Sequence, residues 1–301
     1  MDLYNRLCSI AGEKNVLKNE PMSRHTTFRI GGPADYFVMP SSAEEIRRIV
    51  ALCIEEETPH YIIGNGSNLL VGDKGYRGVI IQVFKNMNDI RVEGETIYAQ
   101  AGALLAKVAS AACAAELTGF EFASGIPGTL GGAVRMNAGA YGGEMKQVLK
   151  NAVVLTPEGE ILTLSVDEMK MGYRTSIVSR MDYVVLEAEI ALKKGERENI
   201  LAKTEELREK RVSKQPLEYG SAGSTFKRPA GYFAGKLIED AGLRGLRVGN
   251  AQVSEKHCGF VINRGGATAK EVKELMDEVV RRVEANSGVH LEPEVKRIGE
   301  F

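Results

Sequence analysis

A glycine-rich stretch in the middle of the chain constrains the possible fold more than any other sequence feature. Residues 124–143 read SGIPGTLGGAVRMNAGAYGG, which holds seven glycines in twenty positions and a single charged side chain, Arg135. Glycine allows positive φ angles and lets other groups come close to the backbone. The stretch also contains apolar residues such as Ile126, Leu130 and Val134, for which a flexible linker has no use. The pattern indicates ordered backbone close to another group, and composition leaves a glycine-rich structural crossover open as the alternative.

The composition is that of a soluble globular protein and argues against several classes. With 301 residues, of which 44% are hydrophobic and 26% charged, the chain can bury cores in two or three domains. A formal net charge of −1 argues against a general affinity for nucleic acid or anionic membranes. No apolar run of about 18 residues predicts a membrane span, and the opening MDLYNRLCSIAGEKN lacks the pattern of a signal peptide. The cysteines and histidines form no CxxC, HxH or HExxH pattern, so we predict reduced thiols in the cytoplasm and no metal site.

Helix and strand signals change along the chain and predict three parts. Up to about residue 85, a capping box at residues 42–45 begins a helix that ends before Pro59, and short strands at 61–63 and 78–83 follow, as in a small α/β unit. From residue 86, the runs IRVEGETIYAQA and VVLTPEGEILTLS each predict a hairpin. Residues 216–301 read as a separate α+β domain. The expected later elements are helices at 103–117, 196–213, 232–241 and 269–286 and strands at 249–253, 258–262 and 289–296.

A second glycine motif, GNGSNLLV at 64–71, follows the first predicted buried strand. Consecutive glycine and asparagine amides after a strand suit the binding of an anion such as a pyrophosphate. The motif is neither a Walker A loop nor a GxGxxG fingerprint, and an ordinary tight turn explains it equally well. Together, the two glycine loops predict a site that wraps one dinucleotide.

Three polar clusters contain residues suited to chemistry. Arg174 lies in YRTS, Ser224 precedes Lys227 and Arg228 in GSTFKRP, and Glu294 lies in LEPEVKRIG. Each also has an ordinary explanation: a surface arginine, a loop with a serine turn, and a charge on an edge strand. Spacing along the sequence does not show whether the three clusters meet.

Taken together, these segments resemble the UDP-N-acetylenolpyruvoylglucosamine reductase (MurB) family. The resemblance covers both glycine loops and the three polar clusters. It extends to HTTFRIGGPADYFV at 25–38 and GYFAGKLIEDAGLRG at 231–245, in the same order along nearly the whole chain. The short run between Arg174 and Ser224 resembles the type II members, which lack an inserted loop over the substrate.

The resemblance implies an α+β fold in which a two-part FAD-binding domain of the vanillyl-alcohol-oxidase (PCMH) type precedes a C-terminal α+β substrate-binding domain. Residues 1–85 would form the first FAD-binding subdomain, to which residues from about 292 to 301 would return. Residues 86–215 would form the second subdomain and residues 216–301 the substrate-binding domain.

It also implies an activity: reduction of UDP-N-acetylglucosamine enolpyruvate to UDP-N-acetylmuramate in peptidoglycan precursor synthesis. FAD would bind non-covalently, and NADPH would be the hydride donor. The implied partners are these small molecules, and we expect no nucleic acid, no membrane and no obligate protein partner.

The resemblance assigns roles motif by motif. Arg174 would hold the negative charge that builds on the substrate, Ser224 would protonate the α-carbon, and Glu294 would polarise the substrate together with Arg174. Lys214 and Arg228 align with residues that contact the diphosphate, with Lys227 as a further candidate; the longer members carry asparagine at the position of Arg228. The implied FAD contacts are Gly64, Asn65, Gly66, Ser67 and Asn68 in the first loop and Ser124, Gly125, Ile126, Pro127, Gly128, Thr129, Gly131, Gly132, Asn137 and Ala138 in the second.

Two other functions share the glycine loops. One is a different flavoenzyme on the same scaffold, such as an oxidase with covalently attached flavin. The other is a non-enzymatic sensor of dinucleotides or nucleotide sugars. The GSTFKRP and LEPEVKRIG segments favour the reductase.

Overall fold

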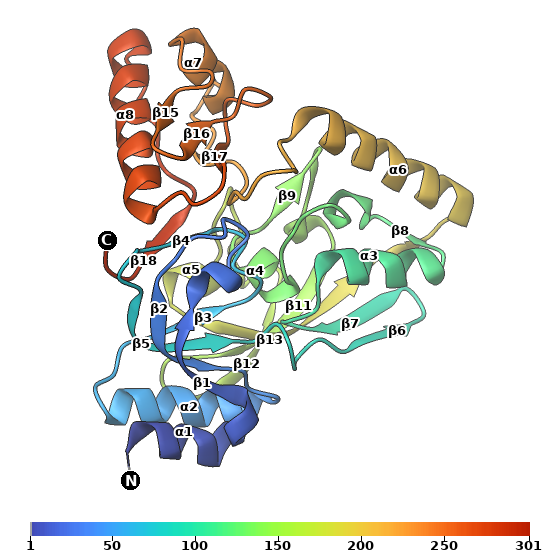
Figure 1. The fold of residues 1–301 in the computed structure, drawn as a ribbon. Helices are drawn as coiled ribbons and strands as arrows, with labels where there is room; N and C mark the ends of the chain where they lie inside the picture. The colour runs from blue at the N-terminus through green and yellow to red at the C-terminus, as the bar shows by residue number, and fades with distance from the viewer. Residues whose placement is uncertain (1) are drawn as a thin grey trace. The chain divides into compact units, whose positions relative to one another are not determined.

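The computed structural model describes residues 2–301 (Figure 1). The helices are α1 Leu3–Ala11, α2 Ala43–Glu55, α3 Leu105–Ala114, α4 Leu130–Arg135, α5 Ile177–Arg180, α6 Arg197–Lys214, α7 Ala234–Asp240 and α8 Ala269–Ser287. The strands are β1 Val16–Pro21, β2 Pro33–Val38, β3 His60–Ile63, β4 Leu69–Val71, β5 Tyr76–Gln82, β6 Ile90–Glu93, β7 Thr96–Gln100, β8 Leu117–Thr118, β9 Gly139–Ala140, β10 Gly143–Glu144, β11 Leu149–Leu155, β12 Ile161–Ser165, β13 Val184–Ala191, β14 Lys193–Lys194, β15 Arg247–Val248, β16 Ala251–Val253, β17 Val261–Asn263 and β18 Lys296–Ile298.

The described residues divide into two compact units. The first unit contains the residues up to 17 together with 36–65 and 79–211, and the second contains 18–35, 66–78 and 212–301. The chain passes from one unit to the other within β1, β2, β5 and α6, and once in the loop after β3. The three-part division expected from the sequence, with boundaries after residues 85 and 215, stays a prediction.

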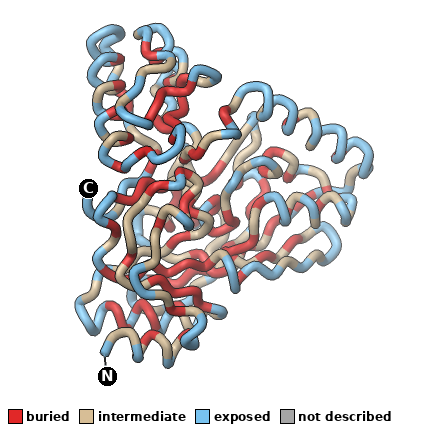
Figure 2. Tube along the Cα trace, viewed as in Figure 1, coloured by how far each residue is buried: buried red, intermediate tan, exposed pale blue. Residues whose placement is uncertain are grey.

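Short-range hydrogen bonds explain where the main helices begin. Ser42 Oγ accepts a hydrogen bond from the Glu45 amide at the start of α2. Thr268 and Glu271 form a reciprocal capping box at the start of α8. Both helices begin where the sequence predicts, but the expected capping box forms fully only at α8. At α2 the Glu45 carboxylate accepts from the Ser41 amide in place of the Ser42 amide. The expected charged helix is α6, which buries Ile200 and Leu207 and leaves most other side chains exposed (Figure 2).

A five-stranded antiparallel sheet of order β12-β11-β13-β7-β6 lies in the first unit. Both expected hairpins are confirmed: the last pairs before the turns are Glu93 with Thr96 and Leu155 with Ile161. A four-stranded sheet has the order β1-β2-β5-β3, in which β3 and β5 run parallel.

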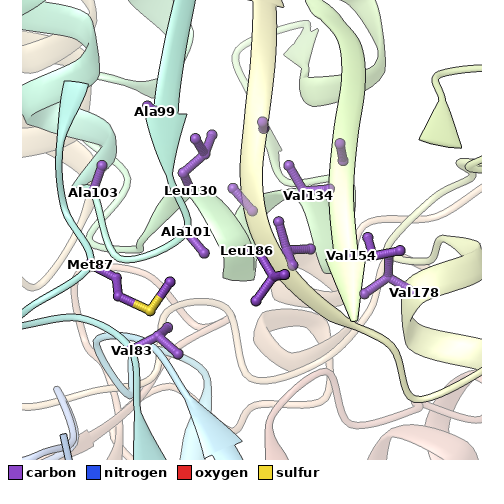
Figure 3. Close-up of a cluster of buried hydrophobic side chains, with 14 of the residues drawn as sticks. Val83, Met87, Ala99, Ala101, Ala103, Leu130, Val134, Val154, Val178 and Leu186 are labelled. Carbon is purple, nitrogen blue, oxygen red and sulfur yellow. The ribbon is translucent and has the colours of Figure 1, made fainter. Parts of the chain in front are cut away.

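The apolar side chains of the glycine-rich stretch belong to the core of the first unit. Leu130 and Val134 on α4 are fully buried. They belong to the same buried cluster as Ala101 and Leu186, which are labelled with them in Figure 3. These side chains anchor α4 in the core, so the glycines between them are held in ordered backbone. This explains why the stretch combines glycine with apolar residues.

In the second unit, a three-stranded sheet of order β15-β16-β17 accompanies α7 and α8. A second cap adds to Thr268 at the start of α8, since the Asp73 carboxylate accepts hydrogen bonds from the amides of Ala269 (2.7 Å) and Lys270 (2.9 Å). Near the C-terminus, β18 pairs in parallel with β4, with Lys296 opposite Leu69. The chain end is therefore tied to the residues that follow the first glycine loop.

The expected strand at 289–296 is wrong over most of its length. Only Lys296–Ile298 forms a strand there, preceded by an isolated antiparallel bridge between Pro293 and Phe226. Backbone hydrogen bonds from the Lys227 and Glu294 amides lie on either side of Pro293, but the pairing stays a single bridge and extends into no ladder. The other expected elements are present with shifted ends.

No helix among residues 2–301 has the length and apolarity that crossing a membrane requires. Within the same residues, no group of three His, Cys, Asp or Glu side chains is placed to hold a metal ion.

Candidate active site

Within the first unit, the end of β3 brings Gly64 and Asn65, the start of the first glycine loop, against the second glycine loop. A Cβ atom at Gly64 would lie 2.1 Å from Thr129 Oγ1, so a larger residue does not fit there. The next residue bonds to the same stretch, since Asn65 Nδ2 donates to the Pro127 carbonyl at 2.8 Å. Residues 64–65 and 127–129 therefore form one local site.

Two buried polar atoms in this site lack hydrogen-bond partners among residues 2–301, namely Thr129 Oγ1 and Gln82 Oε1. Both side chains are 2% exposed, and buried polar groups in folded proteins are normally bonded. Thr129 is the residue before α4, yet its hydroxyl does not cap that helix. A dinucleotide has hydroxyl donors and phosphate acceptors, so these residues fit a dinucleotide cofactor.

Sequence reasoning missed Gln82. Its Nε2 atom lies 3.5 Å from the Gly64 carbonyl, which places the side chain beside the first glycine loop. The signal for it is a single polar residue at the end of the apolar run GVIIQV, where a buried polar side chain needs a partner.

Other residues of the glycine-rich stretch are held by close contacts. The amides of Leu130 and Gly131 donate to the carbonyls of Ala103 and Ala101, each at 2.8 Å. A Cβ at Gly131 would lie 2.8 Å from the Ala101 Cβ, so α4 needs glycine to come this close to the residue that follows β7. Ala138 is buried, and its amide donates to the Ala133 carbonyl at 2.8 Å.

At the other end of the stretch, Gly125 lies against Arg211 of α6. The Cβ of any larger residue would meet Arg211 Nε at 2.7 Å. Burial lowers the pKa of the Arg211 guanidinium. Sequence reasoning also missed this arginine, for which the only signal is its place one helical turn before Lys214.

Arg174 lies beside the last part of the glycine-rich stretch. Its turn is closed by reciprocal backbone bonds between Gly172 and Thr175, and Arg174 itself has a φ of 54°. The Arg174 Nη2 atom lies 3.4 Å from the Gly139 carbonyl, and the guanidinium carbon lies 5.3 Å from the centre of the Tyr173 ring. The first unit thus joins Arg174 to the loop that contains the predicted cofactor contacts.

In the second unit, a short antiparallel pairing brings Ser224 and Glu294 into neighbouring segments. The Glu294 amide donates to the Thr225 carbonyl, and the Lys227 amide donates to the Glu292 carbonyl, both at 2.8 Å. Thr225 is buried and its Oγ1 accepts from the Val261 amide, while the adjacent Ser224 is exposed. Hydrogen bonds to residues 259–261 and 292–294 fix the segment that contains Ser224, while the Ser224 side chain stays accessible to a ligand.

The same pairing reaches the first glycine loop. Asn68 Nδ2 donates to the Glu294 carbonyl at 3.2 Å, across 226 positions of sequence. Two positions earlier, Gly66 has a φ of 61°, and a Cβ there would lie 2.0 Å from the His25 carbonyl oxygen. Among residues 2–301, no hydrogen bond is donated by the amides of residues 64–68, which leaves them available to an anion.

The three cations expected near the diphosphate differ in their surroundings. Lys214 is exposed at the end of α6. Lys227 forms an ion pair of 2.8 Å with Glu292, and this ammonium holds the pKa of the Glu292 carboxyl below its usual range. The Arg228 guanidinium stacks at 3.9 Å on the Phe233 ring and donates to the Tyr232 carbonyl.

Comparisons with known proteins match both parts of the chain. Residues 34–165 match the model of an FAD binding domain, and residues 215–298 match the model of the UDP-N-acetylenolpyruvoylglucosamine reductase C-terminal domain. The chain is 54% identical to the UDP-N-acetylenolpyruvoylglucosamine reductase of Lachnoclostridium phytofermentans, over 99% of this chain and 97% of that protein. It is 55% identical to that of Agathobacter rectalis, over 95% of each chain. The crystal structure of MurB from Thermus caldophilus superposes with a TM-score of 0.81 at 35% identity, covering 94% of this chain and 98% of that one.

The fold and the glycine-lined site define an FAD-binding oxidoreductase. The expected fold class, a flavin-binding part followed by a C-terminal α+β domain, is confirmed. Within that class, the chain belongs to the UDP-N-acetylenolpyruvoylglucosamine reductase (MurB) family.

The buried Thr129 hydroxyl has no hydrogen-bond partner among residues 2–301. Its removal should therefore affect the stability of the apoprotein and the affinity for FAD differently. In Thr129→Val, we expect the free energy of unfolding of the apoprotein to stay unchanged or to rise by up to about 1 kcal/mol, because a buried hydroxyl without a partner is removed. The affinity for FAD should fall about tenfold if the hydroxyl bonds to the cofactor. Urea unfolding of the apoprotein and FAD titration measure the two quantities.

Thr156→Val is the matched control. Thr156 is also buried, but its Oγ1 accepts a hydrogen bond from the Glu160 amide in the β11–β12 hairpin. We expect this change to destabilise the apoprotein by about 1 kcal/mol and to leave FAD affinity unaltered. If Thr129→Val behaved like Thr156→Val, its hydroxyl would have no role in cofactor binding.

Proposed function

We propose that this chain reduces UDP-N-acetylglucosamine enolpyruvate to UDP-N-acetylmuramate, with non-covalent FAD and with NADPH as the hydride donor. The observation that carries the proposal is family membership along nearly the whole chain, covering both the FAD-binding part and the C-terminal domain. The four cysteines are free, as is usual in the reducing cytoplasm, where we place the reaction. The partners we propose are small molecules alone.

The chemistry explains which side chains the reaction needs. A bound FAD would supply the redox chemistry, the transfer of hydride from NADPH to the β-carbon of the enolpyruvyl group. Hydride addition leaves negative charge on the α-carbon, and the neighbouring carboxylate takes up this charge as an enediolate. The protein must therefore hold a developing anion and deliver a proton to the α-carbon.

Arg174 suits the first task. A guanidinium stays charged at all relevant pH values and binds a carboxylate through two parallel N–H bonds. Its left-handed backbone conformation supports a functional role, because such strain in a non-glycine residue concentrates at functional sites. We propose that Arg174 binds the substrate carboxylate and stabilises the enediolate.

Ser224 and Glu294 suit the second task. Ser224 is exposed on a segment fixed by the buried Thr225, so its hydroxyl can meet the substrate and recover its proton from water. Glu294 belongs to the paired segment. We propose that Ser224 donates the proton to the α-carbon and that Glu294 polarises the substrate together with Arg174.

Lys214 is our first choice for the substrate diphosphate. Lys227 is paired with Glu292, and Arg228 is stacked on Phe233, so binding a phosphate through either would compete with a contact that the chain already makes. We rank Lys214 above both on this ground.

An absorbance experiment tests the proposed function. We expect the purified protein to show the spectrum of oxidised flavin, to bleach when NADPH is added without oxygen, and to recover its colour when the enolpyruvyl sugar follows. Acid precipitation should leave FAD in the supernatant. A yellow pellet would instead indicate covalently attached flavin, and a bleached protein that the sugar does not reoxidise would contradict the proposed substrate.

A further inference from the structure

We propose that Asn137 is a positioning residue that fixes the Arg174 turn, and that its side chain does not bind the cofactor. The family resemblance implies instead that Asn137 contacts FAD. The inference rests on the proposed function, because it gives Asn137 a role through Arg174.

The side-chain amide of Asn137 is already used within the chain. It is 1% exposed, and its Nδ2 donates to Glu144 Oε2 at 3.0 Å and to the Gly172 carbonyl at 3.1 Å. Its Oδ1 accepts from the Lys146 amide at 2.9 Å. A primary amide has two N–H donors, so both are occupied and none is left for a ligand.

The bond to Gly172 acts directly on the arginine turn. The Gly172 carbonyl also accepts from the Thr175 amide, and this bond closes the turn that contains Arg174. Directly after the turn, the fully buried Ser176 donates a hydrogen bond from its Oγ to the Arg135 carbonyl at 2.6 Å. Residues 135–139 thus hold the turn at its beginning, at its end and at the arginine itself.

The backbone of the turn explains why such anchoring is needed. Arg174 and Asn137 have φ angles of 54° and 45°, both in the left-handed region. Asparagine tolerates this conformation better than most residues, whereas arginine does not, and a strained residue persists only where its surroundings fix it. Without the Asn137 bond, we expect the turn to relax and the guanidinium to leave the position it needs for the substrate.

Asn137→Gly tests the inference, since glycine keeps the positive φ and removes the amide. We expect reoxidation of reduced flavin by the enolpyruvyl sugar to slow about tenfold to a hundredfold, the range known for a small misplacement of a catalytic group. FAD content and the rate of bleaching by NADPH should stay within about twofold. Asn137→Asp keeps the size but loses both donors. It should likewise slow reoxidation while FAD content and the rate of bleaching stay nearly unchanged. Asn86→Gly, which removes a surface bond to the Met39 carbonyl, should leave both rates unchanged.

The decisive measurement is the double variant with Arg174→Ala. If Asn137 acts through Arg174, adding Asn137→Gly to Arg174→Ala should slow reoxidation by less than about twofold, whereas independent effects would multiply. Multiplying effects would overturn the inference. Loss of FAD or of bleaching in both Asn137 variants would also overturn it, because Asn137 would then support the flavin site itself. If Arg174→Ala alone left reoxidation unchanged, the proposed role of Arg174 would fail instead.

Discussion

In Ser224→Ala, NADPH is expected to bleach the flavin at a near-normal rate, while reoxidation by the enolpyruvyl sugar slows at least about a hundredfold. The two half-reactions should respond differently to the loss of the Ser224 hydroxyl, because NADPH oxidation requires no proton on the substrate carbon. Reduction of the enolpyruvyl group does require one, and positioned proton transfer contributes about 10²–10⁴ in rate. Anaerobic stopped-flow absorbance follows each half-reaction separately.

The structure allows this test to be interpreted. Ser224 is exposed, and the neighbouring Thr225 hydroxyl, which accepts from the Val261 amide, holds the segment. Removing the Ser224 hydroxyl should therefore leave the fold intact. Ser287→Ala, which removes a hydroxyl bonded to the Val283 carbonyl in α8, is a control in the same unit. Equal slowing of both half-reactions would mean that Ser224 is structural.

Arg174→Ala is expected to slow reoxidation by about 10²–10³-fold, the cost of losing one preorganised donor where an oxyanion develops. Bleaching by NADPH should change little, because the enediolate does not exist in that half-reaction. Arg174→Lys should recover part of the loss, since lysine keeps the charge but lacks the two-pronged geometry of the guanidinium. The rate of the single-turnover reoxidation, measured at saturating sugar, reports this effect directly.

Arg180→Ala is the matched control for charge. Arg180 lies six residues further along and donates to the Lys170 carbonyl on the exposed side of α5. Its removal lowers the local positive charge by the same amount without touching the Arg174 turn. Slowing of similar size in both variants would indicate a general electrostatic effect, and unchanged reoxidation in Arg174→Ala would remove this residue from the mechanism.

Local sequence rules predicted much of the secondary structure. The Ser42 cap of α2, the capping box of α8 and the hairpins β6–β7 and β11–β12 are all predictable from a few adjacent residues. The strand expected at 289–296 is reduced to a single bridge at Pro293, because a local pattern does not show how many residues will find a partner strand.

Only part of the candidate site could be predicted from the sequence. The glycine motifs and the polar segments led to the family, and the comparisons confirm that membership. Gln82 and Arg211 were missed because each is an ordinary residue on its own element and becomes notable only through burial beside a glycine loop. The hydrogen-bond partners of Asn137 lie up to 35 positions away, so its role at the Arg174 turn could not be inferred from the sequence.

By itself, the sequence of this protein determined the family, the activity that family membership supports, and the elements whose signals span a few residues. The tertiary structure alone decided which distant segments meet: Gly64 with Thr129, Asn68 with Glu294, and Asn137 with the Arg174 turn. The physical reason is that capping, turn and periodicity signals arise from neighbouring residues. A hydrogen bond across 226 positions, by contrast, forms only once the whole chain has packed.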